Sequence, residues 1–174
     1  GLFRYDNSID SFSPVRFDIS ASAWVLDIER DKSGELLIAT TEGLFAIDPE
    51  NPVNTISILN GEQINDIELL NSGDFWISTR GSGVLRKQDG EKLENGLEVI
   101  AELSSSNIKS GVNSIKQLQN GDTWISTNTG LTLVKLGQNL VSIDITKTNN
   151  SNNLLSTAHM TRTFESLSGL VWQG

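Results

Sequence analysis

The chain has 174 residues, of which 37% are hydrophobic, so it is long enough for one domain or one array of repeats and too apolar for a disordered chain. Its net charge of −9 disfavours nucleic acids and anionic membrane surfaces as partners, because both would be repelled. It has no Cys, which excludes disulfides and thiolate chemistry, and no apolar run approaches the roughly 18 residues of a membrane helix.

The first segment in chain order, residues 1–20, begins with GLFRYD. This run matches GLFAID at 43–48 and GLTLVK at 130–135, each of which is the third run of a longer unit. We therefore expect residues 1–20 to form the third and fourth strands of a split unit. No signal peptide is recognisable, and because the chain begins with Gly rather than Met, we expect it to be a piece of a longer protein.

Three whole units follow, at residues 21–60, 61–107 and 108–155. Each holds a short apolar run, a turn with Gly beside Asn, Ser or Asp, a second run centred on Leu or Trp, a Thr-x-x-Gly turn and a third run. A less regular fourth run closes the unit. Runs of this length, rich in β-branched and aromatic residues and bounded by turn residues, are typical of strands. No segment shows sustained helical periodicity with caps.

The units share one register. The turn glycines and the large apolar residues three positions after them are Gly34, Gly73, Gly121 and Gly169, followed by Leu37, Trp76, Trp124 and Trp172. From Trp76 to Trp124 and from Trp124 to Trp172 the interval is 48 residues. A fixed interval of this size indicates a repeat architecture. Four antiparallel strands in about 40–50 residues, repeated, predict an all-β fold, a β-propeller of four-stranded antiparallel blades.

Each repeated residue has an expected structural role. The Trp side chains should be core residues that fill the wedge between neighbouring blades, since an aromatic side chain buries roughly 150–250 Å². The glycines should adopt positive φ in tight hairpins. The Thr that ends each second run should accept a hydrogen bond from a backbone amide of the following turn.

The last segment, residues 156–174, ends with SGLVWQG and matches the first and second strands of a blade. The chain therefore carries three complete blades and two complementary half-blades, four blades' worth in all. Unpaired strand edges favour aggregation, so the half-blades need partners. They can close a four-bladed ring within the chain, pair with a second copy in an eight-bladed homodimer, or belong to a native protein with more blades.

The unit VNSIKQLQNGDTWISTNTGLT, residues 112–132, resembles the two-component regulator propeller repeat. That family combines an apolar inner strand, an acidic residue with Gly, then Trp-Ile-Gly-Thr, Gly-Leu and a strand that often ends near Tyr-Asp, as GLFRYD does. Ser78 and Ser126 stand where the family usually has Gly, and Ala39 does so in the first unit, where Leu37 also replaces Trp. The resemblance covers essentially the whole chain and differs from WD40 repeats, because neither Trp-Asp nor Gly-His occurs.

This resemblance implies a sensor domain. Such repeats usually form the exported N-terminal part of bacterial membrane receptors, whose output part is a histidine kinase or a diguanylate cyclase with a GGDEF domain. Carbohydrates are often the recognised ligands. The resemblance thus implies a periplasmic location, a membrane-anchored parent and a small-molecule or carbohydrate ligand. The chain has no kinase, cyclase or nucleotide-binding signature, so we expect it to sense rather than catalyse and to need no cofactor.

The expected ligand site lies on one face of the ring. The loop between second and third strands lies on the same face as the entry into each inner strand, and loops on rigid scaffolds commonly carry binding function. We predict as ligand contacts Trp24, Gln63, Arg80, Asn113, Asn128, His159 and Arg162. An aromatic ring, amides and an imidazole there can stack on and hydrogen-bond a sugar. The alternative is that these are solvated loop residues and one wedge Trp.

The remaining polar residues favour no catalytic or metal site. His159 is the only His, and it has no neighbouring nitrogen or sulfur donors with which to form a metal site. Arg162 stands where other units have Asp27, Asp66 or Ser114, so it either pairs with these acids across the channel or holds a carboxylate or sulfate ligand. Two other functions stay open, because propellers host many. One is a propeller lyase or hydrolase acting on a glycoside or lactone-type substrate, like the streptogramin lyases, and the other is a protein-binding propeller.

Overall fold

The computed structural model describes residues 1–91, 96–100, 103, 108, 111–136, 140–144, 163–166 and 169–173. In this part of the chain the elements are sixteen β-strands. No helix among these residues is long and apolar enough to cross a membrane. The predicted positions His159 and Arg162 lie outside the described residues.

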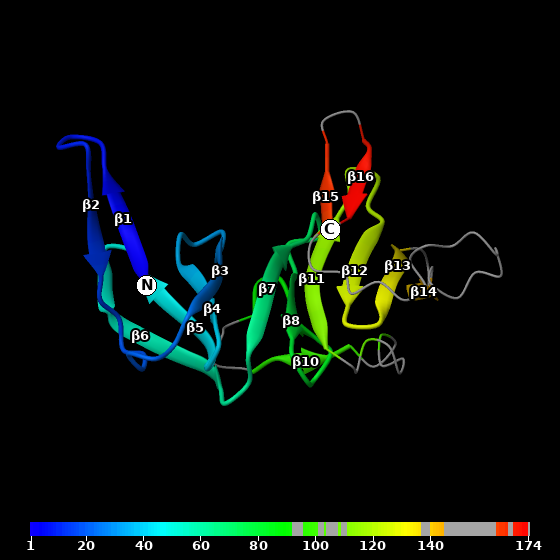
Figure 1. Ribbon diagram of the computed structural model, residues 1–174, viewed down its shortest axis with the longest axis horizontal. Coiled ribbons are helices and arrows are strands. Elements are labelled where there is room, and N and C mark those ends of the chain that lie inside the picture. Colours follow the sequence, from blue (N-terminus) through cyan, green and yellow to red (C-terminus); the bar gives the residue numbers. More distant parts are fainter. Residues whose placement is uncertain are drawn as a thin grey trace.

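Three four-stranded antiparallel sheets make up the body of the molecule (Figure 1). Blade 1 consists of β3 (Val25–Arg30), β4 (Leu36–Thr40), β5 (Gly43–Asp48) and β6 (Asn51–Asn60). Blade 2 consists of β7 (Ile64–Leu69), β8 (Phe75–Thr79), β9 (Val84–Lys87) and β10 (Glu98–Val99). Blade 3 consists of β11 (Val112–Gln117), β12 (Thr123–Thr127), β13 (Gly130–Leu136) and β14 (Leu140–Asp144). Spatial order equals chain order in each sheet, which confirms the predicted all-β fold with four-stranded antiparallel sheets.

Two hairpins flank these blades. The head hairpin pairs β1 (Leu2–Asp6) with β2 (Ser11–Val15), and the tail hairpin pairs β15 (Thr163–Glu165) with β16 (Val171–Gln173). Figure 1 shows them at the two ends of an open arc. Within the described residues, β1 pairs only with β2 and β15 only with β16.

The turn chemistry follows the repeat. The four hairpin glycines have φ between 80° and 97°, and the amide of each donates to the carbonyl three residues earlier. At the next turn, Thr40 Oγ1 accepts from the amide of Gly43 at 3.0 Å, and Thr79 Oγ1 accepts from Ser82 at 2.8 Å. Thr127 Oγ1 likewise accepts from the amide of Thr129 at 3.2 Å. The predicted positive φ at the glycines and the Thr-to-amide bonds are therefore both confirmed.

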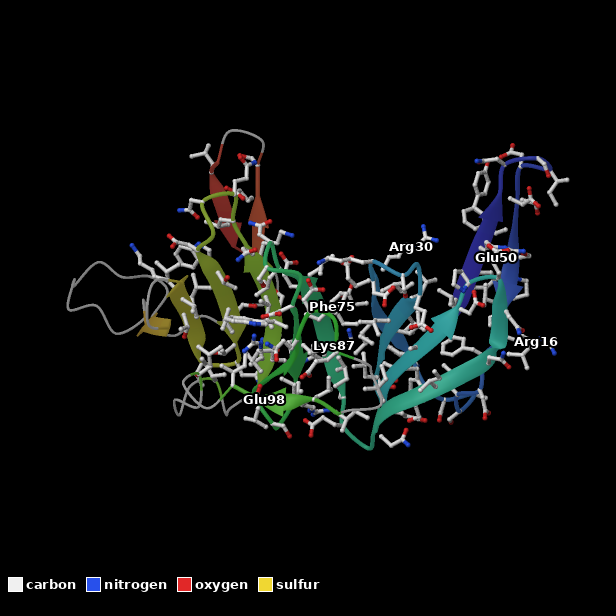
Figure 2. All side chains as sticks on the ribbon, turned by 180° about the vertical axis from the view of Figure 1, so that it is seen from behind. Arg16, Arg30, Glu50, Phe75, Lys87 and Glu98 are labelled. Carbon is white, nitrogen blue, oxygen red and sulfur yellow. The ribbon has the colours of Figure 1, made fainter. Side chains whose placement is uncertain are left out.

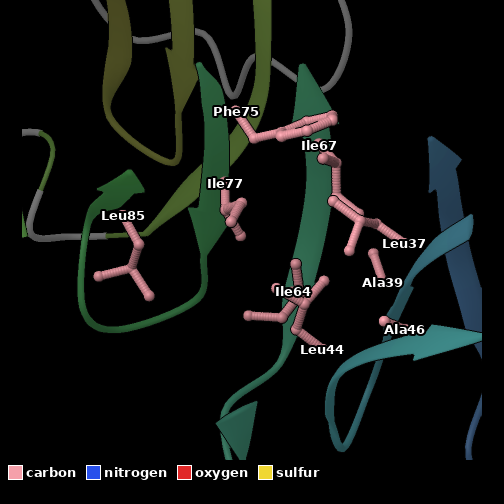
Figure 3. Packing of buried hydrophobic residues seen from close by; sticks show 9 residues of the cluster. All are labelled: Leu37, Ala39, Leu44, Ala46, Ile64, Ile67, Phe75, Ile77 and Leu85. Carbon is pink, nitrogen blue, oxygen red and sulfur yellow. The ribbon is translucent and has the colours of Figure 1, made fainter. Parts of the chain in front are cut away.

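The core lies between the blades. Leu37 of blade 1 is fully buried and packs with Ile64, Ile67 and Phe75 of blade 2 (Figure 3). At the next junction Trp76 is 3% exposed and packs with a cluster that includes Val112. Each such side chain contributes roughly 1.5–3 kcal/mol when fully buried. The wedge prediction is thus confirmed for the first two junctions.

The third junction is less complete. Trp124 is half-buried rather than buried. Trp172 lies in β16, and its side chain is outside the described part. At the other end, Leu2 and Val15 of the head hairpin pack against Ile38 and Phe45 of blade 1.

Each inner strand has a β-bulge at the same position. The register shifts between Val25 and Asp27 in β3, between Ile64 and Asp66 in β7, and between Val112 and Ser114 in β11. A bulge re-aims the side chains beside it. Asn65, inside the bulge of β7, donates from Nδ2 to the carbonyl of Val112 in blade 3 at 2.6 Å.

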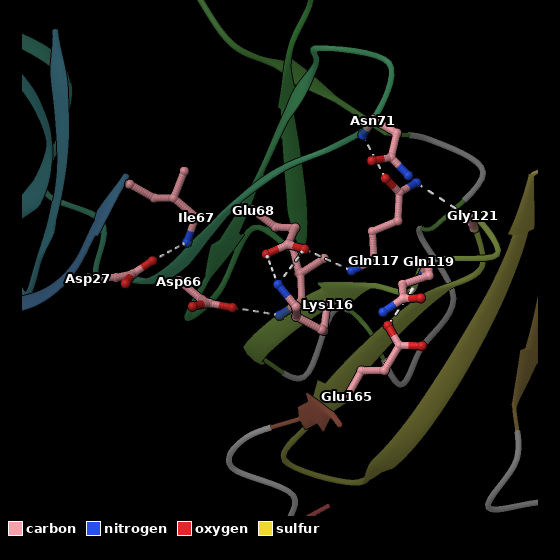
Figure 4. Close-up of polar contacts among 11 residues, drawn as sticks. Asp27, Asp66, Ile67, Glu68, Asn71, Lys116, Gln117, Gln119, Gly121 and Glu165 are labelled. Carbon is pink, nitrogen blue, oxygen red and sulfur yellow. Dashed lines mark hydrogen bonds and ion pairs between the residues drawn. The ribbon is translucent and has the colours of Figure 1, made fainter. Parts of the chain in front are cut away.

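Carboxylates connect neighbouring inner strands through backbone amides. Asp27 Oδ2 accepts from the amide of Ile67 at 2.8 Å, and Asp66 Oδ2 accepts from the amide of Ile115 at 2.7 Å (Figure 4). Charge-assisted bonds of this kind are roughly twice as strong as neutral ones. The same side chain thus satisfies an amide at the edge of the next sheet and fixes its position.

We predict that Asp66→Ala lowers the free energy of unfolding by about 1–3 kcal/mol, because the amide of Ile115, a 2% exposed residue, loses its acceptor. Asp66→Asn should cost less, since an amide oxygen still accepts. Urea denaturation measures both. The control is Asp18→Ala, which removes an exposed carboxylate and should change stability by no more than about 0.5 kcal/mol. Equal effects of Asp66→Ala and Asp18→Ala would contradict the proposed role of the inter-blade bond.

Candidate functional site

The loop after each second strand meets the start of the inner strand of the same blade. The amide of Thr41 donates to the carbonyl of Trp24 at 3.0 Å, and the amide of Arg80 donates to Gln63 at 3.0 Å. In blade 3 the amide of Asn128 donates to Gly111 at 3.2 Å. These equivalent bonds place the described members of the predicted set on one face of the arc, called the loop face below.

Gln63 and Arg80 are in direct contact. Arg80 Nη1 donates to Gln63 Oε1 at 3.2 Å, and Gln63 Nε2 donates to Asn65 Oδ1 at 2.7 Å. Because Asn65 continues to the carbonyl of Val112, a chain of hydrogen bonds runs from the loop of blade 2 to the inner strand of blade 3. The arginine end of this chain is exposed, so the network fixes Arg80 at the surface of a junction between blades.

Asn128 joins this junction from blade 3. A Cβ at Gly111 would lie 2.6 Å from Asn128 Nδ2 and 2.9 Å from the carbonyl oxygen of Arg80. Gly111 also has φ of 113°, where L side chains are strained. Glycine at this position therefore lets the two loops approach, and the structure brings Gln63, Arg80 and Asn128 together.

The other predicted residues lie elsewhere. Trp24 is 71% exposed and belongs to blade 1. Asn113 is half-buried in the bulge of β11, at the position equivalent to Asn65. Sequence reasoning missed Glu62, whose Oε1 accepts from the amide of Gly81 at 2.8 Å and whose Oε2 accepts from Ser82 Oγ at 2.8 Å. The sequence does carry a signal for this residue, because Glu62 is an acidic residue directly before Gln63, where the chain enters the inner strand.

A cavity of about 450 Å³ adjoins this face in blade 1. Thr41 and Glu42 of the β4–β5 loop line it, together with Phe45, Asn60 and Gly61. Its size falls in the roughly 300–1,000 Å³ range of small-molecule sites.

A polar cavity of about 170 Å³ lies along the inner strands β3, β7 and β11. Its charged lining residues are Asp27, Glu29, Asp66, Glu68 and Lys116. In the described part of the chain, no group of three or more His, Cys, Asp or Glu residues is arranged to hold a metal ion. The hydrogen bonds and the ion pair of these side chains form a network that connects the three inner strands.

Glu68 is the central residue of that network (Figure 4). Its Oε1 accepts from the amide of Gln117 at 2.9 Å, and its two oxygens lie 3.0 and 3.2 Å from Lys116 Nζ. Burial raises the pKa of the Glu68 carboxyl, and the Gln117 amide and the Lys116 ammonium offset part of this rise. Desolvation thus outweighs the favourable partners.

Bacterial extracellular domains share this fold. The extracellular domain of a one-component system from B. thetaiotaomicron matches with a TM-score of 0.74 at 18% identity, and that of a hybrid two-component system from the same organism with 0.71 at 21%. Both matches cover 100% of this chain but only 23% and 22% of the neighbours' chains. Virginiamycin B lyase from Staphylococcus aureus matches with 0.65 at 12% identity, over 98% of this chain and 55% of that chain.

No protein-family model matches the chain, and no curated protein does. Because the identities are low, the likeness to solved structures shows the fold alone. The chain spans less than a quarter of the length of the two B. thetaiotaomicron domains.

The raised pKa of Glu68 predicts a pH-dependent stability. The folded state keeps the Glu68 proton to higher pH than the unfolded chain, whose carboxyl has a pKa of about 4.5. Stability contributed by this group is therefore greatest below that value and falls as pH rises from about 4.5 through the folded pKa. Glu68→Gln removes the titration, so the variant should gain stability relative to wild type across this window.

Urea denaturation at a series of pH values measures this difference. Glu50→Gln is the control, because it removes one exposed negative charge and leaves the inner-strand network intact. A wild-type minus Glu68→Gln difference that rises with pH in this window would show that the sign is wrong.

Proposed function

We propose that this chain is part of a ligand-sensing, extracytoplasmic β-propeller of a bacterial receptor. Two observations support the proposal: the resemblance of its repeats to the two-component regulator propeller, and its fold likeness to extracellular domains of one- and two-component systems. In this proposal the parent protein is anchored in the inner membrane and its output domain is a histidine kinase or a diguanylate cyclase. The chain described here binds the signal and performs no catalysis.

The proposed ligand is a small molecule or carbohydrate bound on the loop face at the junction of blades 2 and 3. The main support for this location is the exposed Arg80, whose guanidinium is held by Gln63 beside Asn128. A guanidinium has five N–H donors, of which Gln63 accepts one, and the Asn128 amide can both donate and accept. Such a group suits a ligand rich in hydroxyl or carboxylate oxygens.

Ring closure belongs to the same proposal. Within the described residues the head and tail hairpins are two-stranded, and exposed edges invite pairing. We propose that further blades of the parent or a second copy of this chain supply the missing strands. Light scattering coupled to size exclusion separates a homodimer from a monomer.

The likeness to virginiamycin B lyase favours a second candidate, a lyase or hydrolase acting on a glycoside or lactone-type substrate. His159 is the only His in the chain and would be the first residue to substitute in a test of this activity. If the wild-type chain turns over such a substrate and the His159→Ala variant does not, the result would favour the lyase. The third candidate function is binding of a protein partner in place of a small molecule.

We expect a sugar or oligosaccharide screen to yield a ligand that raises the melting temperature. At a ligand concentration of 100 times Kd the stabilisation is about 2.7 kcal/mol, which corresponds to roughly 5–10 °C for a chain of this size. Arg80→Ala should reduce the shift, whereas Arg16→Ala, which removes an exposed arginine directly after β2, should leave it unchanged. Equal shifts in both variants would place the ligand elsewhere and refute the loop-face site.

A further inference from the structure

A cavity lies at the junction of blades 1 and 2, at the other end of the strands from the loop face. It has a volume of about 510 Å³ and is formed by the β3–β4 hairpin, the β7–β8 hairpin and the loop after β9. Phe75 and Lys87 lie where blade 2 faces blade 1 (Figure 2).

Lys87 is an unusual residue in this cavity. It is only 8% exposed, and its Nζ lies 5.5 Å from the centroid of the Phe75 ring, which is itself buried. Within the described residues the Lys87 ammonium makes no direct hydrogen bond or ion pair, and it acts at longer range on Asp89, whose pKa it helps to lower. An aromatic face attracts an ammonium group but does not accept its three hydrogen bonds. Because Lys87 lines the cavity, the N–H donors of its ammonium are available to an acceptor bound there.

The rim of the cavity is acidic. Its charged side chains, besides Lys87, are Asp31, Lys32, Glu35, Asp89 and Glu91. Lys32 Nζ pairs with Asp89 Oδ2 at 2.6 Å and so connects the two blades. Asp31 Oδ1 already accepts from Ser33 Oγ and from the amide of Glu35. The carboxylates of Glu35 and Glu91 have no hydrogen-bond donor among the described residues.

These charges select the ligand class. A simple anion would satisfy Lys87 but would meet four carboxylates against two ammonium groups. A simple cation would satisfy the rim but would offer the Lys87 ammonium no hydrogen-bond acceptor. A neutral polyol would compensate neither charge. A zwitterion satisfies both ends and adds no net charge, and the volume of the cavity is in the range of small-molecule sites.

We propose that this cavity binds a zwitterion of the amino acid or short peptide class. Its carboxylate accepts from Lys87 Nζ at the floor, and its ammonium donates to Glu35 and Glu91 at the rim. The site spans blades 1 and 2, whereas the loop-face site spans blades 2 and 3. The inference therefore stands independently of the proposed sensing of a carbohydrate.

The test is calorimetric titration of the full chain with glycylglycine. Acetate and ethylamine serve as the two half-ligands, and glucose as a neutral polyol. We expect glycylglycine to bind at least about tenfold more tightly than any of the three. Absence of glycylglycine binding at about 10 mM, or tighter binding of glucose, would overturn the proposal.

Variants test the two ends separately. Lys87→Met keeps the apolar stem over Phe75 and should fold, yet it should weaken glycylglycine binding about tenfold or more. The matched control is Lys135→Met, which removes an exposed lysine of blade 3 and should leave binding unchanged. Glu91→Gln combined with Glu35→Gln should also weaken binding. Equal affinities of wild type and a folded Lys87→Met variant, with folding checked by thermal melting, would refute the site.

Discussion

The carboxylate-to-amide bond between inner strands is the interaction on which this architecture depends. The inner strand of each blade is a sheet edge, and its amides need acceptors that no neighbouring strand supplies, since adjacent blades form separate sheets. Asp27 and Asp66 provide these acceptors across two successive junctions. A side-chain carboxylate reaches farther than a direct backbone hydrogen bond between paired strands. Neighbouring blades can therefore stand at an angle to one another and remain connected at their inner strands. Leu37 and Trp76 then fill the wedge that this angle opens.

The junction after blade 3 uses a different connection. Ser114 occupies the position of Asp27 and Asp66, and it bonds within its own blade to Ser126. The tail hairpin is held instead from its own side, since Glu165 Oε2 accepts from the amide of Gln119 at 3.0 Å. The repeat therefore conserves the chemistry of a carboxylate on a backbone amide while changing which blade contributes the acid.

Repetition explains what the sequence could predict. The turn glycines and the wedge residues recur four times in one register, and the Thr of the following turn recurs three times, so the repeat identifies them without coordinates. The hydrogen bonds between blades could not be predicted, because they depend on strand register and on the neighbouring blade. The bulge that turns Asn65 toward Val112 has no signature in a run such as INDIEL. Trp124 has the sequence context of Trp76 but is only half-buried. Lys87 ends a strand, where a lysine normally indicates a solvated surface, and only the packing of Phe75 against blade 1 shows that it is covered.

Both candidate sites cross a junction rather than lying within one blade. The Arg80 network connects blades 2 and 3, and the Lys87 cavity is walled by blades 1 and 2. In an array where each repeat contacts only its neighbours, stability is close to a sum of repeat and junction terms. A ligand bound across a junction changes the free energy of that junction and leaves the sheets themselves unaltered. A ligand bound at either site would therefore stabilise that junction by mass action, alongside the inner-strand carboxylates that connect the same pairs of blades.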